Sequence, residues 1–73
     1  MAELSPAQYD ALERAIIDRR RISVVRRGTE FVVVPLRLFV RNGMEAIEAR
    51  HPTTGDDLTL MIHELDEVEI VSW

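Results

Sequence analysis

The chain has 73 residues, no cysteine, and thirteen acidic against nine basic residues, which gives a net charge of −4. The length predicts a single domain over residues 1–73, and a chain without cysteine forms no disulfide bond or thiolate metal site, which fits a cytoplasmic protein. No apolar run approaches the roughly 20 residues that span a membrane, so we expect no membrane association. A domain this small gains limited stability from its own core, and we therefore expect a homo-oligomer.

The charges are distributed unevenly along the chain. Residues 1–41 hold eight arginines against five acidic residues, whereas residues 42–73 hold one arginine against eight acidic residues. Two halves of opposite sign are able to attract each other or a partner. Every basic residue is an arginine. This bias is explained by a GC-rich genome, and the functional alternative is bidentate contacts with phosphate or carboxylate.

A helix is predicted over residues 6–20. Ser5 is the expected N-cap, Gln8 completes a capping box, and Leu4 with Tyr9 forms an apolar staple around the helix start. Apolar residues then recur at the three- and four-residue spacing of one helix face: Tyr9, Leu12, Ala15 and Ile16. Three consecutive arginines at the helix end complement its dipole.

Strands are predicted from residue 22 to about residue 72, where the apolar period changes to two. Gly28 supplies the first turn, and Pro35 marks an edge, a bulge or a bend because it donates no hydrogen bond to a ladder. Asn42-Gly43 is typical of a two-residue hairpin turn. Residues 51–57 form a loop, and a single helical turn around residues 63–65 precedes the last strand.

The turn at Asn42-Gly43 fixes the register of its two strands. It predicts five pairs: Arg41 with Met44, Val40 with Glu45, Phe39 with Ala46, Leu38 with Ile47, and Arg37 with Glu48. One face is expected in the core and carries Leu36, Leu38, Val40, Ile47 and Ala49. The opposite face, with Phe39 and Ala46, is expected on the outer surface.

One helix followed by about five short strands predicts a mostly β fold with one N-terminal α-helix, a small five-stranded SH3-like or Sm-like barrel. The expected core is Leu12, Ile16, Val24, Val33, Leu38, Ile47, Leu60, Ile62, Val68 and Ile70.

The order of helix, strand, turn and proline-containing strand resembles the start of a WYL domain, a small β-barrel attached to many bacterial transcription regulators. The matching residues are Ala11, Leu12, Ala15, Ile16, Ile22, Val24, Val33, Pro35 and Leu38. Residues 59–68 also align without a gap with the last segment of such a domain. Most family members carry a helix-turn-helix domain ahead of this one, so the resemblance implies a divergent, stand-alone WYL-like domain.

Several family positions are changed. The tripeptide that names the family falls on Glu45-Ala46-Ile47, and Glu64 and Met61 occupy positions of basic residues. In the family, such arginines and aromatic residues help form a surface that senses a ligand or nucleic acid. A glutamate there reverses the charge and repels a phosphate.

Two surfaces are candidate sites. The helix end and the first hairpin are expected to join their arginines in one patch, in which Arg20, Arg21, Arg26 and Arg27 contact the phosphates of a nucleotide or single-stranded nucleic acid. The alternative is a solvated helix end that neutralises the acidic half. A protein interface is predicted at Phe39, Met44, Met61 and Trp73, beside Ala46. The alternative is that Met61 and Trp73 complete the core.

No catalytic residue, metal site or cofactor is predicted. His51 and His63 lack a recognisable partner motif, and Asp56-Asp57 is typical of a turn. The sequence contains no nucleophile motif, phosphate loop or zinc-ligand spacing. Two functions remain, both without catalysis: a regulatory module that binds a small ligand or nucleic acid, and a protein-interaction or self-association module.

Overall fold

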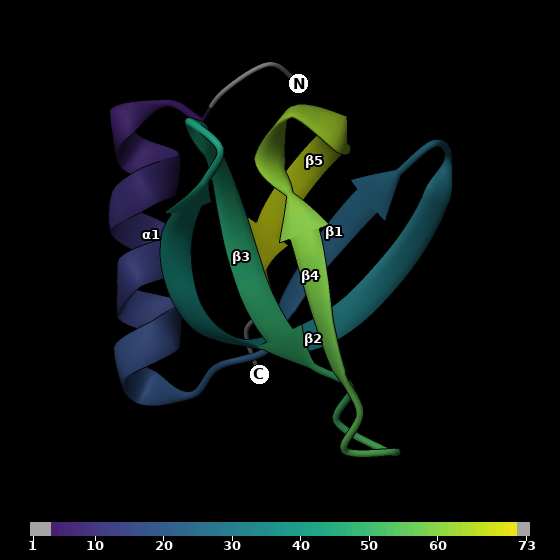
Figure 1. The fold of residues 1–73 in the computed structure, drawn as a ribbon. Helices are drawn as coiled ribbons and strands as arrows, with labels where there is room; N and C mark the ends of the chain where they lie inside the picture. The colour runs from purple at the N-terminus through teal and green to yellow at the C-terminus, as the bar shows by residue number, and fades with distance from the viewer. Residues whose placement is uncertain (1–3, 72–73) are drawn as a thin grey trace.

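Figure 1 shows the computed structural model, which describes residues 4–71. One helix and a short 3₁₀ turn accompany five strands, in the order α1 (Pro6–Asp18), β1 (Ile22–Arg26), β2 (Thr29–Arg41), β3 (Met44–Arg50), β4 (Asp57–Met61), η1 (Ile62–Glu64) and β5 (Leu65–Ile70). This arrangement confirms the predicted mostly β class, with a small barrel-like fold behind one N-terminal helix. No helix in residues 4–71 has the length and apolar character that crossing a membrane requires.

The start of α1 is built as its sequence predicts. The Ser5 hydroxyl accepts a hydrogen bond from the Gln8 backbone N–H at 3.2 Å, and the Ser5 N–H donates to the Gln8 side chain at 2.8 Å. Leu4 is buried and Tyr9 packs against the core. The capping box and the apolar staple therefore satisfy the free amides and fix the direction in which the chain enters the helix.

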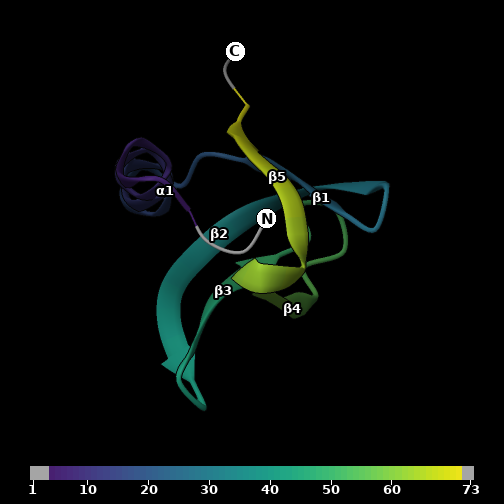
Figure 2. The same ribbon diagram turned by 90° about the horizontal axis from the view of Figure 1, so that it is seen from above.

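The strands form an antiparallel sheet in the order β4-β3-β2-β1-β5. The first part of the 13-residue β2 pairs with β1 and the later part pairs with β3, so this strand crosses from one half of the barrel to the other. Figure 2 shows β2 curving around the barrel as a long band, with α1 seen end-on beside it. The register shifts between Pro35 and Arg37, so the proline lies at a bulge, one of the predicted alternatives.

All five predicted pairs across the Asn42-Gly43 turn are present. Two of the predicted burial assignments are wrong. Val40, expected in the core, is 66% exposed, because it lies near the tip of the hairpin, beyond the buried part of the sheet. Ala46, expected on the outer surface, is fully buried, because the larger side chains of its cross-strand neighbours, Phe39 and Met61, flank the small methyl group.

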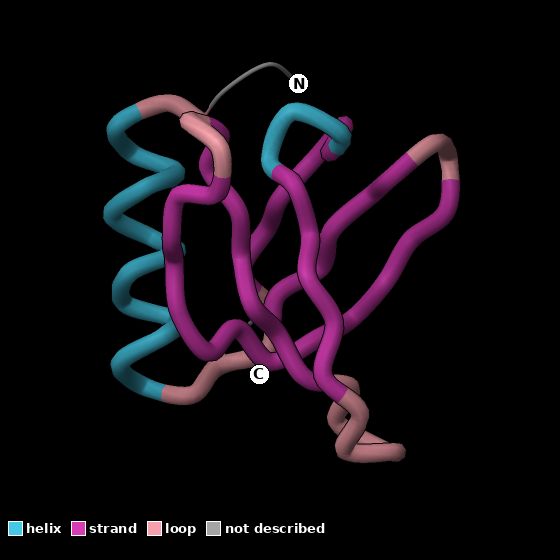
Figure 3. The backbone as a smooth tube through the Cα atoms, viewed as in Figure 1, coloured by secondary structure: helices cyan, strands magenta, loops and turns pink. Residues whose placement is uncertain are grey.

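The core lies between the curved sheet and α1. All ten predicted core residues are buried or packed against the buried cluster. Ala49, expected on the core face of the hairpin, is buried as well, and the buried cluster also contains Leu4, Ala15, Ile22 and Leu65. The coloured tube in Figure 3 shows that the turns lie at the ends of the strands, outside this core. The arginines of the candidate sites occupy two of these connections.

Candidate functional site

The first arginine cluster follows the last turn of α1. The Arg19 N–H donates to the Ile16 carbonyl at 3.4 Å, and the Arg20 N–H donates to the Ala15 carbonyl at 2.9 Å. These two bonds form a Schellman motif, which ends the helix at Asp18, two residues before the predicted end. Arg19 itself has φ 57°, a left-handed conformation that glycine adopts most easily. The helix therefore ends on a strained arginine.

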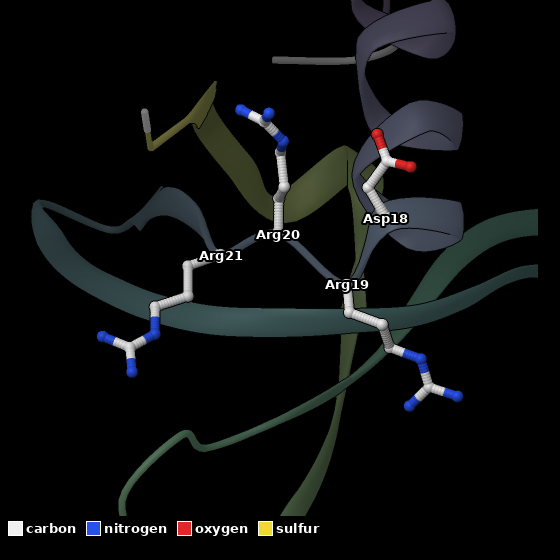
Figure 4. A pocket seen from close by; sticks show the side chains of 4 residues that line it. All are labelled: Asp18, Arg19, Arg20 and Arg21. Atoms are coloured by element: carbon white, nitrogen blue, oxygen red, sulfur yellow. The ribbon is translucent and has the colours of Figure 1, made fainter. Parts of the chain in front are cut away.

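Arg19, Arg20 and Arg21 line a shallow depression of about 560 Å³ together with Asp18. Figure 4 shows that the three arginine side chains point in different directions, and that Arg20 extends to the same side as Asp18. Within residues 4–71, Arg37 pairs with Glu48 and Arg50 pairs with Asp57, and neither pair involves Arg19 or Arg20. We name this group of Asp18, Arg19, Arg20 and Arg21 the helix-end cluster.

The second cluster lies at the turn between β1 and β2. Arg27 has φ 52° and Gly28 has φ 78°, so both central residues of this two-residue turn are left-handed, as a type I′ turn requires. The Arg26 guanidinium lies over the Phe31 ring, 5.2 Å from its centre. We name the group of Arg26, Arg27, Phe31 and Glu64 the hairpin cluster; with Thr29 it lines a pocket of about 300 Å³.

The two clusters lie at opposite ends of β1. The five residues of this strand separate them by about 17 Å at the usual rise per residue. Arg20 and Arg21 therefore lie in one group and Arg26 and Arg27 in another, rather than in the single patch that the sequence predicted. Glu64 lies in the hairpin cluster and reduces its net positive charge.

A third group of arginines, which the sequence analysis missed, lies on the outer face of β2. The guanidinium carbons of Arg37 and Arg41 lie 4.7 Å and 5.2 Å from the centre of the Phe39 ring. Arg37 also pairs with Glu48 at 3.5 Å. The spacing of two residues along a strand places these three side chains on one face and is the sequence signal that would have found them.

The predicted interface residues occupy different environments. Met44 is 49% exposed, whereas Met61 is partly buried beside Ala46. The Phe39 ring is in contact with arginines, so this strip is less apolar than expected. Trp73 lies outside the described residues.

The segment Glu45-Ala46-Ile47 has a structural role in this chain. The Tyr9 hydroxyl donates a hydrogen bond to the Glu45 carboxylate, which ties the start of α1 to the start of β3. Ala46 and Ile47 are both buried. Glu45 therefore supports the packing of the helix, and Ile47 contributes to the core.

The acidic second half of the chain contributes one well-formed ion pair. The Arg50 Nε lies 2.8 Å from the Asp57 carboxylate, and this hydrogen bond, with the attraction between the two charges, raises the pKa of Arg50. Both side chains are about half exposed. Arg50 is thus an arginine whose charge is already matched, which makes it a useful reference for the helix-end cluster. No three His, Cys, Asp or Glu side chains gather closely enough for a metal ion within residues 4–71.

The sequence matches no protein-family model and no curated protein. Among solved structures, the fold is similar to proteasome accessory factor B/C (PafBC) of Arthrobacter aurescens, with a TM-score of 0.76 and 20% sequence identity. The match covers 100% of this chain and 13% of PafBC. PafBC contains a WYL domain. The fold is WYL-like. At this low identity the likeness concerns the fold alone, and this chain corresponds to a small part of the larger protein.

Proposed function

We propose that this chain is a cytoplasmic regulatory module, without catalytic residues or cofactor, that binds the phosphates of single-stranded nucleic acid or a nucleotide. The observation that carries the proposal is the helix-end cluster, where Arg19 and Arg20 are exposed and take no part in the ion pairs of residues 4–71. The WYL-like fold and its likeness to PafBC, a protein of the transcription-regulator type, support a regulatory role.

The geometry of the helix-end cluster favours a polyanion over a single phosphate. A site for one phosphate requires guanidinium groups that converge, whereas the side chains of Arg19, Arg20 and Arg21 diverge (Figure 4). Diverging charges suit successive phosphates along one strand. The Asp18 carboxylate on the same side opposes this binding, so the expected affinity is modest.

The hairpin cluster is a second, weaker contact in this proposal. Arg26 and Arg27 supply two positive charges, and Glu64 in the same pocket opposes them. The Arg26 guanidinium already lies over Phe31, so this ring offers less of its surface to a stacked base.

The test is fluorescence anisotropy of a labelled single-stranded oligonucleotide at 50 and 200 mM salt. Two to three phosphate contacts give a salt slope of about −1.4 to −2.1, so the affinity should fall roughly 7- to 18-fold between these concentrations. Replacing Arg20 and Arg21 with glutamine should reduce the slope by about 1.4. The control is Arg50→Gln, which removes an arginine already paired with Asp57 and should leave the slope nearly unchanged.

Absence of binding at the lower salt concentration would reject the nucleic-acid proposal. A salt slope that Arg50→Gln reduces as much as the loss of Arg20 or Arg21 would show that net charge, rather than the helix-end cluster, causes the binding.

A second candidate is a module that binds another protein through the predicted interface of Phe39, Met44 and Met61, which we name the outer strip. The exposure of Met44, which pairs with Arg41 two residues after Phe39, is the observation that favours it. This second candidate predicts that Phe39→Asp or Met44→Asp abolishes the association with the partner protein. It also predicts that the association persists at high salt. Co-purification of the intact chain with its partner, with and without these substitutions, distinguishes it from the first proposal.

A further inference from the structure

An apolar groove runs between α1 and β2, and its residues are different from those of both arginine clusters, although Ile17 directly precedes Asp18 of the helix-end cluster. It has a volume of about 340 Å³ and is lined by Glu13, Ile16, Ile17, Arg37 and Leu38. Ile17 is 78% exposed, more than any other large apolar side chain in residues 4–71. Isoleucine is among the residues most often buried in folded proteins, and its exposure at the edge of an apolar groove makes this surface a candidate contact for another molecule.

The exposed apolar surface extends along β2. Leu38 and Val40 are two residues apart and project from the same side of the strand, and Val40 is 66% exposed. Ile17 lies one helical turn after Glu13 on α1, so these two side chains share one helix face. The groove thus has apolar side chains from both α1 and β2, and Ile17 of α1 is the most exposed of them.

The two walls of the groove carry opposite charges. Glu13 belongs to α1 and Arg37 belongs to β2, and the ion pairs of residues 4–71 join Arg37 to Glu48 rather than to Glu13. A surface with both signs, one on each side of an apolar centre, is complementary to itself after a two-fold rotation. An axis near Ile17 would bring the two Ile17 side chains together and place each Glu13 opposite Arg37 of the second copy.

We infer that this groove is the interface of a homodimer, in which two copies pack α1 and β2 together around Ile17. A stable interface buries about 1,200 Å² in total, or about 600 Å² from each copy. That is roughly an eighth of the 4745 Å² of accessible surface of this chain. The inference is independent of phosphate binding, because neither arginine cluster contributes to the groove.

Sedimentation velocity from 5 to 500 µM tests this inference. The wild type should shift from the 8.4 kDa monomer to twice that mass as the concentration rises. Ile17→Asp should weaken association at least tenfold. Val32→Asp is the matched control, because Val32 is an exposed apolar residue of the other half of the sheet, and it should associate as the wild type does. Thermal melts establish that each variant is folded.

Charge exchange tests the geometry of the pair. Glu13→Arg or Arg37→Glu alone places like charges across the two-fold axis and should weaken the dimer, whereas the two substitutions together should restore it. A wild type that stays monomeric at 500 µM would overturn the inference and would leave the groove to a segment of another protein. Dissociation by Phe39→Asp but not by Ile17→Asp would overturn it in favour of the outer strip. A double variant no stronger than the single variants would also overturn the proposed pairing.

Discussion

Replacing Arg19 with glycine should stabilise the protein while removing a positive charge from the helix-end cluster. Arg19 has φ 57°, and the left-handed conformation costs a residue with a side chain roughly 1–2 kcal/mol. Glycine avoids this cost but loses about 0.5–1 kcal/mol more backbone entropy on folding. The difference between the middle values of these two ranges predicts a gain of about 0.75 kcal/mol, or roughly 3–6 °C in Tm for a domain of this size.

Arg20→Gly is the matched control for this prediction. It removes the same charge from the adjacent position, where the backbone is not left-handed. Glycine there brings only its entropic loss, so the protein should be destabilised by about 0.5–1 kcal/mol. The change in attraction between an arginine and the helix dipole is similar for both variants and largely cancels in the comparison. Arg19→Ala keeps the strain while losing the charge, and it separates the two effects.

Thermal and urea denaturation followed by circular dichroism provide the assay, since a domain this small is expected to unfold in one cooperative step. The predicted order of stability is Arg19→Gly, then wild type, then Arg20→Gly. If Arg19→Gly is no more stable than Arg20→Gly, the strain argument for this helix end is refuted, because the conformation would then carry no measurable cost.

Four further substitutions test other parts of the structure. Leu60→Ala, at a fully buried position, should lower the free energy of unfolding by about 2–5 kcal/mol, measured by urea denaturation. Val32→Ala, at the exposed surface, should change the free energy of unfolding by less than about 0.5 kcal/mol. Equal effects of the two substitutions would contradict the assigned core. Tyr9→Phe removes the hydrogen bond to Glu45 and should lower the free energy of unfolding by about 0.5–1.5 kcal/mol in the same urea denaturation. An unchanged free energy of unfolding would show that this hydrogen bond contributes nothing to stability. Glu64→Gln should strengthen binding to a single-stranded oligonucleotide about 2- to 5-fold by anisotropy, since it removes a repulsive charge from the hairpin cluster; weaker binding would contradict the placement of Glu64.

The sequence predicted the fold through signals that act over short distances. The Ser5 capping box and the Asn42-Gly43 turn each depend on a few adjacent residues, and both are present as predicted. The burial errors at Val40 and Ala46 arose where tertiary packing decides: a face assigned by alternation does not reveal where the core ends or which neighbours cover a small side chain.

The candidate site was harder to predict for a similar reason. The sequence identified Arg20, Arg21, Arg26 and Arg27 as a group, but the distance between the two pairs depends on the direction in which β1 runs from the helix end. The stacking of Arg37 and Arg41 on Phe39 was detectable from strand spacing alone. The groove beside Ile17 depends on how α1 lies against β2, and no local pattern specifies that angle.

Backbone strain at one arginine of each cluster is an indication of function that is separate from the charge of the cluster. Three residues other than glycine have positive φ in the described chain: Arg19, Arg27 and Asn42. Asparagine tolerates this conformation well, whereas arginine does not, so the chain accepts a less stable residue once in each cluster. Strained residues of this kind often belong to functional sites. If phosphate binding explains Arg19, then Arg19→Gly should lose oligonucleotide affinity while it gains stability. Unchanged affinity would show that this strain has no part in binding, even if the helix-end cluster binds through its other arginines.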